Sequence, residues 1–175
     1  MKQMKIFKDN LTLKKKLSGI KRLSFIPTMG GLHDGHKYLI KKGKKLGKKT
    51  LVSIYVNPKQ FNSKLDFKSY PRHIKKDLII LKKLKVDYVY LPNDKDIYSF
   101  KPRNKIYQNK FSKILCGKFR KTHFEGVLNV VNRFLEIIKP QYILLGKKDF
   151  QQMKLIEMHI KKRKINTKVI PCKTI

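Results

Sequence analysis

Short apolar runs alternate along the chain with stretches in which apolar side chains recur every three or four residues. The first pattern is typical of buried strands and the second of amphipathic helices. Apolar runs that predict strands lie at 23–27, 50–56, 87–91 and 142–145, with a last one near Val169. Helix-spaced apolar positions lie at 35–46, 73–85 and 127–138, with a further helix expected from about Asp149.

This alternation predicts a single α/β domain, with a parallel sheet and helices on both faces. At 175 residues the chain is long enough to bury one such core but not two large ones. In sheets of this kind, ligands bind at the carboxyl ends of the strands, near the point where the strand order reverses. The long connection at 57–72 is therefore a functional candidate, whereas residues 93–122 are too weakly patterned for assignment.

The net charge of +33 would attract polyanions, and it makes a nucleic-acid-binding protein the alternative from a different functional class. Lysine supplies 38 of the 44 basic residues, alanine is absent, and the lysines are spread along the whole chain. This bias matches AT-rich codons, and no segment interleaves aromatic and basic residues as RNA-binding modules do. We therefore interpret the charge as a solvated surface and expect no specific nucleic-acid partner.

Two features of the sequence predict a cytoplasmic protein. Cys116 and Cys172 are far apart and match no metal or disulfide spacing, so we expect reduced thiols. No run approaches the ~20 apolar residues that span a bilayer, and residues 1–10 lack the apolar stretch of a signal peptide. We therefore expect no membrane partner.

The strongest chemical signal is the segment Pro-Thr-Met-Gly-Gly-Leu-His-Asp-Gly-His at 27–36, which leaves a predicted strand and opens a predicted helix. Its glycines allow close backbone approach to a ligand, and the free N–H groups of a helix N-terminus suit phosphates. His33 and His36 can donate hydrogen bonds to phosphate oxygens whose charge grows as the α–β bond of ATP breaks. The segment resembles the HxGH signature of the nucleotidylyltransferase superfamily, which implies a Rossmann-like parallel sheet with helices on both faces. Taken alone, a structural turn or a metal-binding pair would be the alternative.

Two further blocks follow predicted strands, at 52–61 and at 145–152. In the first, the amides of Asn57 and Gln60 can hold a hydroxy acid through both donor and acceptor groups. In the second, Lys148 can neutralise a phosphate or carboxylate, and Asp149 can accept hydrogen bonds from ribose hydroxyls. Alone, the first block is an ordinary Asn-Pro turn, and the second is a capped helix start with solvated lysines.

Together, PTMGGLHDGH, VSIYVNPKQF with YPR, THFEGV and GKKDFQQ resemble, in this order and spacing, the N-terminal-domain motifs of the pantothenate synthetase family. The resemblance runs from about Leu23 to Pro171. It implies that pantoate and ATP form pantoyl adenylate and pyrophosphate, and that β-alanine then attacks to give pantothenate and AMP. Another HxGH nucleotidylyltransferase with a different acceptor is the alternative enzyme, but the QF and KDxQQ blocks are not generic to that superfamily.

The resemblance also implies roles for individual residues. His36, His33 and Lys148 would be catalytic, with His36 the usual candidate for proton donor. ATP would be bound by Met29, Gly30, Gly31, Leu32, His33, Asp34, Gly35, His36, Gly146, Lys147, Lys148 and Asp149.

For the acid and the amine, the resemblance implies that Gln60, Gln152 and Asn57 bind pantoate, with Gln60 also near β-alanine. Arg120 and His123 match a segment near the mouth of the cavity.

The P-loop pattern is absent, which excludes a Walker-type ATPase. The eleven acidic residues do not cluster as metal ligands, so we expect no resident metal and Mg²⁺ carried in with the ATP phosphates.

The sequence departs from the family pattern at three places. Lys147 stands where the family usually has Glu, and Lys121 replaces the usual Pro before Thr122. The resemblance implies that residues 1–175 form the ATP- and pantoate-binding domain, and that the chain ends before the C-terminal lid domain of the family. Without that lid we expect weak nucleotide binding and slow or absent turnover, because water would compete for the activated acyl group. The family commonly forms homodimers, and we expect the same here.

Overall fold

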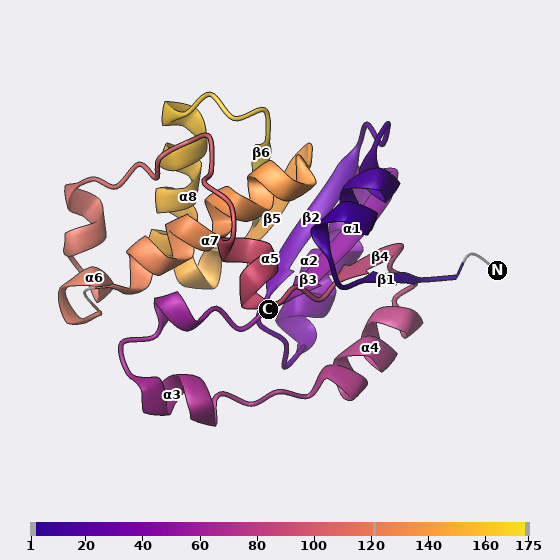
Figure 1. Cartoon of the computed structure of the whole chain (residues 1–175), viewed down its shortest axis with the longest axis horizontal. Coiled ribbons are helices and arrows are strands. Elements are labelled where there is room, and N and C mark those ends of the chain that lie inside the picture. Colours follow the sequence, from indigo (N-terminus) through magenta and orange to yellow (C-terminus); the bar gives the residue numbers. More distant parts are fainter. Residues whose placement is uncertain (1–2, 121, 174–175) are drawn as a thin grey trace.

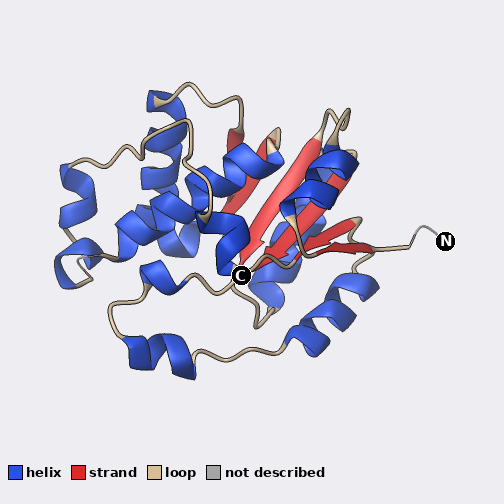
Figure 2. Cartoon of the chain, in the orientation of Figure 1, coloured by secondary structure: helices blue, strands red, loops and turns tan. Residues whose placement is uncertain are grey.

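The computed structural model describes residues 3–120 and 122–173 and confirms the α/β architecture. In this part of the chain, six parallel strands form one sheet in the order β1-β4-β3-β2-β5-β6 (Figures 1 and 2). The strands are β1 (Lys5–Phe7), β2 (Leu23–Thr28), β3 (Lys49–Ile54), β4 (Tyr88–Tyr90), β5 (Tyr142–Gly146) and β6 (Lys168–Cys172).

Helices connect the strands and cover both faces of the sheet. The α-helices are α1 (Asn10–Leu17), α2 (Asp34–Leu46), α3 (Lys64–Ser69), α4 (Ile74–Lys83), α5 (Asp94–Tyr98), α6 (Cys116–Phe119), α7 (His123–Ile138) and α8 (Phe150–Lys162). Short 3₁₀ helices are η1 (Pro58–Gln60), η2 (Lys110–Lys113) and η3 (Lys147–Asp149).

Successive strand residues point to opposite faces, which divides the apolar interior into two clusters. Phe25 and Ile143 pack with α1, α7 and α8, whereas their neighbours Ile26 and Leu144 pack with α2 and α4. In Figure 1, α1 and α7 lie in front of the sheet and α2 lies behind it. Burial on both faces explains why these strands read as continuous apolar runs in the sequence.

The strand order reverses between β2 and β5. From β2 the chain proceeds through β3 to β4 on one side, and β5 and β6 are added on the other. The two central strands pair directly, with Phe25 opposite Ile143. The loops that leave β2 and β5 therefore emerge side by side, and these loops carry the HxGH and KKD segments. The sheet topology thus brings together two motifs that are more than a hundred positions apart in the sequence.

The structure also contains elements that the sequence pattern did not predict. The first is the edge strand β1, which has three residues and is followed by α1. Others are α5, η2 and α6, each of four or five residues, in the weakly patterned segment 93–122. Elements this short do not complete enough helical turns or strand alternations to produce a clear period. The strand predicted at 50–56 instead begins at Lys49 and ends at Ile54.

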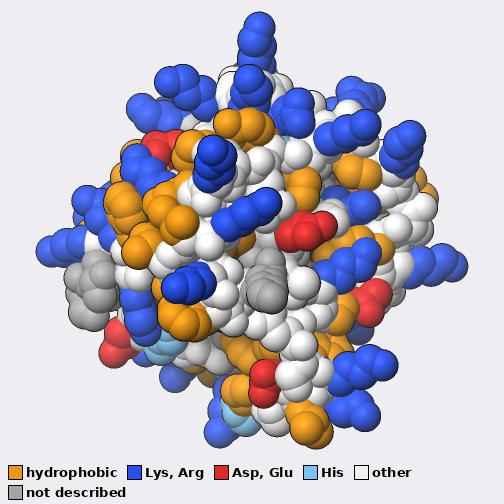
Figure 3. All heavy atoms as spheres, turned by 90° about the vertical axis from the view of Figure 1, so that its left-hand side faces the viewer, with side chains coloured by type: hydrophobic (Ala, Val, Ile, Leu, Met, Phe, Trp, Pro, Cys, Tyr) orange, Lys and Arg blue, Asp and Glu red, His pale blue; other side chains and the backbone are white. Residues whose placement is uncertain are grey.

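Basic side chains are dispersed over the face of the molecule drawn in Figure 3 rather than gathered in one band. On the face drawn in Figure 3, Lys and Arg side chains surround isolated apolar and acidic groups on all sides. Among the described residues, none of the helices is both long and apolar enough to cross a bilayer. Cys116 is exposed and Cys172 is buried, and both thiols are free.

Candidate functional site

A cavity of about 770 Å³ opens at the carboxyl ends of β2, β3 and β5. Most of the residues singled out in the sequence contribute to its wall. The residues among them that line the cavity are Met29, Gly30, His33, Gly35, His36, Asn57, Gln60, Arg120, His123, Gly146, Lys148, Asp149 and Gln152. The three sequence blocks and the THF segment therefore face one shared space.

Four of the residues predicted to bind ATP do not line this cavity. Leu32 is buried, whereas Gly31, Asp34 and Lys147 are exposed. Asp34 forms an ion pair with Lys37 at 2.9 Å, one helical turn further along. A contact between ATP and any of these four residues stays a prediction.

His33 and His36 cap the N-terminus of α2. The backbone N–H of Gly35 donates to Nδ1 of His33 at 3.1 Å, and the backbone N–H of His33 donates to Nδ1 of His36 at 3.4 Å. Because a backbone N–H can only donate, both Nδ1 atoms act as acceptors, and each neutral ring carries its hydrogen on Nε2. The two rings lie 4.1 Å apart between centroids. The cap thus fixes the tautomers of two adjacent imidazoles.

Burial is the main reason that His36 is neutral at pH 7. It lowers the pKa of His36 to about 4, and the neighbouring His33 acts in the same direction. Asp77 and Asp149 oppose this shift because their carboxylates favour the imidazolium form. His36 therefore presents a neutral Nε2–H donor at the cavity wall.

The glycine turn before the histidines is held by a carboxylate that sequence reasoning missed. Gly30 and Gly31 have φ angles of +82° and +63°, which non-glycine residues rarely adopt. Asp77 on α4 is 2% exposed and accepts the backbone N–H of Gly31 at 3.0 Å and of Leu32 at 2.8 Å. The signal in the sequence was a single acidic residue on a helix, with apolar positions one helical turn before and after it.

The loop after β5 supplies charged and polar groups to the same cavity. Gly146 leaves open space, because a Cβ at this position would meet no atom within 4 Å. Lys148 and Asp149 follow in η3 and line the wall. Gln152 also lines it, whereas the adjacent Gln151 is directed away and donates to the carbonyls of Phe111 and Ile114 at 2.7 and 2.8 Å. Of the two glutamines in the KDFQQ block, only Gln152 thus faces the cavity.

Asn57 has its hydrogen-bonding groups satisfied within the protein. Its Nδ2 donates to Oε1 of Gln60 and to the carbonyl of Gly126, each at 3.1 Å. Its Oδ1 accepts from the Tyr98 hydroxyl at 2.7 Å and from the Lys59 backbone at 3.3 Å. An amide has two hydrogens and two acceptor sites, so none is left for a ligand in this arrangement. Direct binding of pantoate by Asn57 stays a prediction.

His123 braces the backbone of the same segment. Its Nδ1 lies 3.0 Å from the backbone carbonyl of Gln60, and because a carbonyl can only accept, Nδ1 carries the hydrogen. Burial lowers the pKa of His123. Arg120 lines the same cavity and is exposed. Lys121, which departs from the family pattern, lies outside the described residues.

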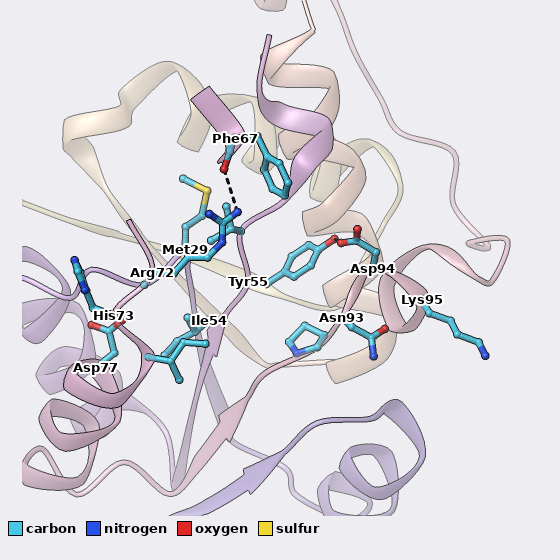
Figure 4. A pocket seen from close by; sticks show the side chains of 14 residues that line it. Met29, Ile54, Tyr55, Phe67, Arg72, His73, Asp77, Asn93, Asp94 and Lys95 are labelled. Atoms are coloured by element: carbon cyan, nitrogen blue, oxygen red, sulfur yellow. Dashed lines mark hydrogen bonds between the residues drawn. The ribbon is translucent and has the colours of Figure 1, made fainter. Parts of the chain in front are cut away.

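A second cavity of about 510 Å³ adjoins the first and shares Met29, Gly30 and Tyr55 with it. Figure 4 shows Tyr55 directed at Asp94, and the hydroxyl donates to that carboxylate at 2.7 Å. On the opposite side, the guanidinium of Arg72 donates to the carbonyl of Phe67 at 3.0 Å (Figure 4). The Tyr55 hydroxyl and the Arg72 guanidinium therefore each have a hydrogen-bond partner within the protein. Within the described residues, no group of three His, Cys, Asp or Glu side chains could hold a metal ion.

Comparison with known proteins decides the family. The family model for pantoate-beta-alanine ligase matches residues 2–175. The chain belongs to the pantoate-beta-alanine ligase family. Its curated relatives include the pantothenate synthetase of Francisella philomiragia, which is 45% identical over 88% of this chain and 59% of its own length. The enzyme of the same name from Francisella tularensis subsp. novicida is 42% identical over 97% of this chain and 67% of its own length.

Solved structures of the pantoate-beta-alanine ligase family share the fold. A ligase from Francisella tularensis, crystallised with beta-gamma ATP and beta-alanine, matches with a TM-score of 0.93 at 40% identity, over 99% of this chain and 68% of that one. Pantothenate synthetase from Thermus thermophilus matches with a TM-score of 0.92 at 27% identity, over 98% of this chain and 62% of that one. The chain thus spans about three fifths to two thirds of the length of these relatives.

Proposed function

We propose that this chain carries the ATP- and pantoate-binding site of a ligase that condenses (R)-pantoate with β-alanine. The proposal rests on one observation, the convergence of two kinds of group in a single cavity. His33, His36 and Lys148 are suited to phosphates, and the amides of Gln60 and Gln152 are suited to a hydroxy acid. Family membership and the ATP and beta-alanine bound to the Francisella tularensis ligase support the same assignment.

The proposed reaction has two steps. A carboxylate oxygen of pantoate attacks the α-phosphorus of ATP, the bond to the pyrophosphate oxygen breaks, and pantoyl adenylate forms. The amine nitrogen of β-alanine then attacks the acyl carbon, loses a proton and expels AMP. Adenylation is needed because a free carboxylate is a poor acyl donor.

The histidine pair suits the first step. Negative charge builds up on pyrophosphate as the α–β bond breaks, and donors fixed before the reaction stabilise such charge most effectively. The two Nε2–H groups are fixed by the cap of α2, and Lys148 adds a positive charge to the same cavity. His36 is neutral in the free chain, but nearby phosphates would raise its pKa and favour proton donation. Mg²⁺ would enter with the ATP phosphates.

Calorimetric titration with MgATP, with and without pantoate, tests the proposal. We expect pantoate to tighten MgATP binding, and the variant His36→Ala to weaken it. A second assay follows the pantoate-dependent exchange of labelled pyrophosphate into ATP without β-alanine, which reports the adenylate step directly. MgATP binding that weakens steeply with salt but ignores both pantoate and His36 would contradict the proposal and favour a non-specific polyanion surface.

Three further expectations about this chain also stay proposals. The lid domain and the homodimer stay predictions of the family resemblance, and the cytoplasmic location stays a prediction from the cysteines and the lack of long apolar runs. The exchange assay on residues 1–175 tests the expectation of slow turnover, and the effect of pantoate on MgATP binding should persist even where the rate is low.

A further inference from the structure

We propose that Tyr98, which does not line the main cavity, is a positioning residue that fixes the orientation of the Gln60 side-chain amide through Asn57. The inference deepens the proposed function and rests on it for the identity of the ligand. It concerns a short chain of hydrogen bonds that leads from the interior to the cavity wall.

The orientation of Asn57 is set by its partners. The Tyr98 hydroxyl lies 2.7 Å from Oδ1 of Asn57, and the Lys59 backbone N–H donates to the same oxygen at 3.3 Å. The Lys59 N–H can only donate, so it requires an oxygen at that position, and the Tyr98 hydroxyl adds a second hydrogen bond to the same oxygen. The NH₂ group of Asn57 therefore faces the other way, toward Gln60 and the Gly126 carbonyl. A rotation of the Asn57 amide by 180° would set its NH₂ group against the Lys59 N–H and its oxygen against the Gly126 carbonyl. The Tyr98 hydroxyl could then no longer donate to Asn57.

Asn57 in turn sets the orientation of Gln60. Its Nδ2 donates to Oε1 of Gln60 at 3.1 Å, which turns the NH₂ group of Gln60 toward the sulfur of Met29 at 3.2 Å. A thioether is a weak acceptor, and both Gln60 and Met29 line the cavity. Gln60 thus presents a donor rather than an acceptor to the cavity. A donor matches a carboxylate or hydroxyl oxygen, whereas a carbonyl oxygen in its place would repel a carboxylate.

Two cationic side chains hold the ring of Tyr98. The Lys59 ammonium lies 3.8 Å from its ring centroid, and the Arg133 guanidinium lies 5.0 Å from it. Arg133 also donates to the carbonyls of Ile97 and Phe100, on either side of the α5 C-terminus, at 3.0 and 2.6 Å. Burial raises the pKa of Tyr98 to about 12, so its hydroxyl keeps its hydrogen at neutral pH. The tyrosine is therefore a fixed donor behind the cavity wall.

Tyr98→Phe tests the proposal, because it removes one hydroxyl and keeps the ring. We expect the Kd for pantoate, measured in saturating MgATP, to rise roughly two- to tenfold, as for one ordinary hydrogen bond. The Kd for MgATP alone should change by less than about twofold, because the nucleotide groups lie on other loops. Tyr88→Phe on β4 is the matched control, since the Tyr88 ring is buried against Phe7 away from the cavity.

A double-mutant cycle separates positioning from general loosening of the fold. In a Gln60→Ala background, Tyr98→Phe should have no further effect on pantoate affinity, because the amide that it positions is gone. An equal weakening of pantoate and MgATP binding by Tyr98→Phe, or an undiminished effect in the Gln60→Ala background, would overturn the proposal.

A measurement without any ligand tests the same chain of contacts independently of the proposed function. The side-chain NH₂ signals of Asn57 and Gln60 can be followed by ¹⁵N NMR in the free chain. Tyr98→Phe should shift both pairs of signals and accelerate their hydrogen exchange, whereas Tyr88→Phe should do neither. Unchanged signals in Tyr98→Phe would overturn the inference. Changed signals in a chain that ignores pantoate would support it and contradict the proposed function instead.

Discussion

The carboxylate of Asp77 accepts the backbone N–H of Leu32 at 2.8 Å, although 45 positions separate the two residues. The same carboxylate accepts the N–H of Gly31 at 3.0 Å. A Cβ at Gly30 would lie 2.9 Å from one of its oxygens. A side chain on α4 therefore fixes the turn that places His33 and His36 at the cavity.

Asp77→Asn should weaken MgATP binding by about tenfold. An amide offers one oxygen where the turn needs two acceptors, and hydrogen bonds to charged groups contribute roughly 1.5–3 kcal/mol. Calorimetry on the variant checks this expectation. Asp66→Asn, on the short helix α3, removes an acidic charge that does not contact the turn and should leave the Kd unchanged. Equal Kd values for wild type and Asp77→Asn would show that the turn holds its shape without the carboxylate.

Lys148→Met and Lys147→Met should separate a charge in the site from a charge on the surface. Both remove one positive charge from η3, but only Lys148 lines the main cavity. We expect the Kd for MgATP to rise at least about tenfold for Lys148→Met and to stay within about twofold for Lys147→Met. Titrations at two salt concentrations would reveal a merely non-specific effect, because both variants would then behave alike.

Gly126→Ala should lower the stability of the fold, whereas Gly146→Ala should not. A Cβ at Gly126 would lie 2.2 Å from the Lys59 carbonyl oxygen, so α7 and η1 would have to separate. We expect the free energy of unfolding to fall by about 1–3 kcal/mol, as in other overpacked interiors, with a loss of pantoate binding. Gly146→Ala meets no protein atom within 4 Å, so its stability should be unchanged while MgATP binding weakens. Urea unfolding measures the stability of both variants, and calorimetry measures their ligand binding. Wild-type stability in Gly126→Ala would contradict the close approach of Gly126 to Lys59.

Acidification should destabilise the fold through His159. This residue is fully buried, and its Nδ1 accepts the Tyr107 backbone N–H at 3.0 Å while Nε2 contacts Oδ1 of Asn132 at 2.9 Å. Burial, and to a smaller extent Arg163, lowers its pKa to about 4 from the ordinary 6.5. Between those values the unfolded chain binds a proton that the folded chain does not bind, so stability falls as the pH falls through this window.

From pH 7 to pH 5 this linkage amounts to about 2 kcal/mol. His159→Gln keeps an acceptor and a donor but cannot titrate, so urea unfolding should show a shallower loss of stability over this range. His73→Gln, at an exposed position, is the matched control. If the free energy of unfolding of wild type and of His159→Gln falls in parallel with pH, His159 does not contribute to the loss of stability.

The sequence alone determined the elements whose apolar residues form a run or recur at helical spacing, and the motifs that follow them. The buried strands β2, β3 and β5 appeared as apolar runs because both faces of the sheet are covered. The stripe in α7 appeared because one side of that helix packs on the sheet. Because these segments carry their own periods, the α/β class could be predicted without any contact information.

Only the tertiary structure decided which side chains meet. The sheet order brings the loops after β2 and β5 together, Asp77 reaches the glycine turn from α4, and Tyr98 reaches Asn57 from the end of α5. Each of these contacts joins residues at least 41 positions apart. The segments that carry Asp77 and Tyr98 give no local sign of their partners, since a lone acid or tyrosine produces no periodicity. A hydrogen bond across the fold depends on where the packed elements place two atoms, and local sequence does not encode that distance.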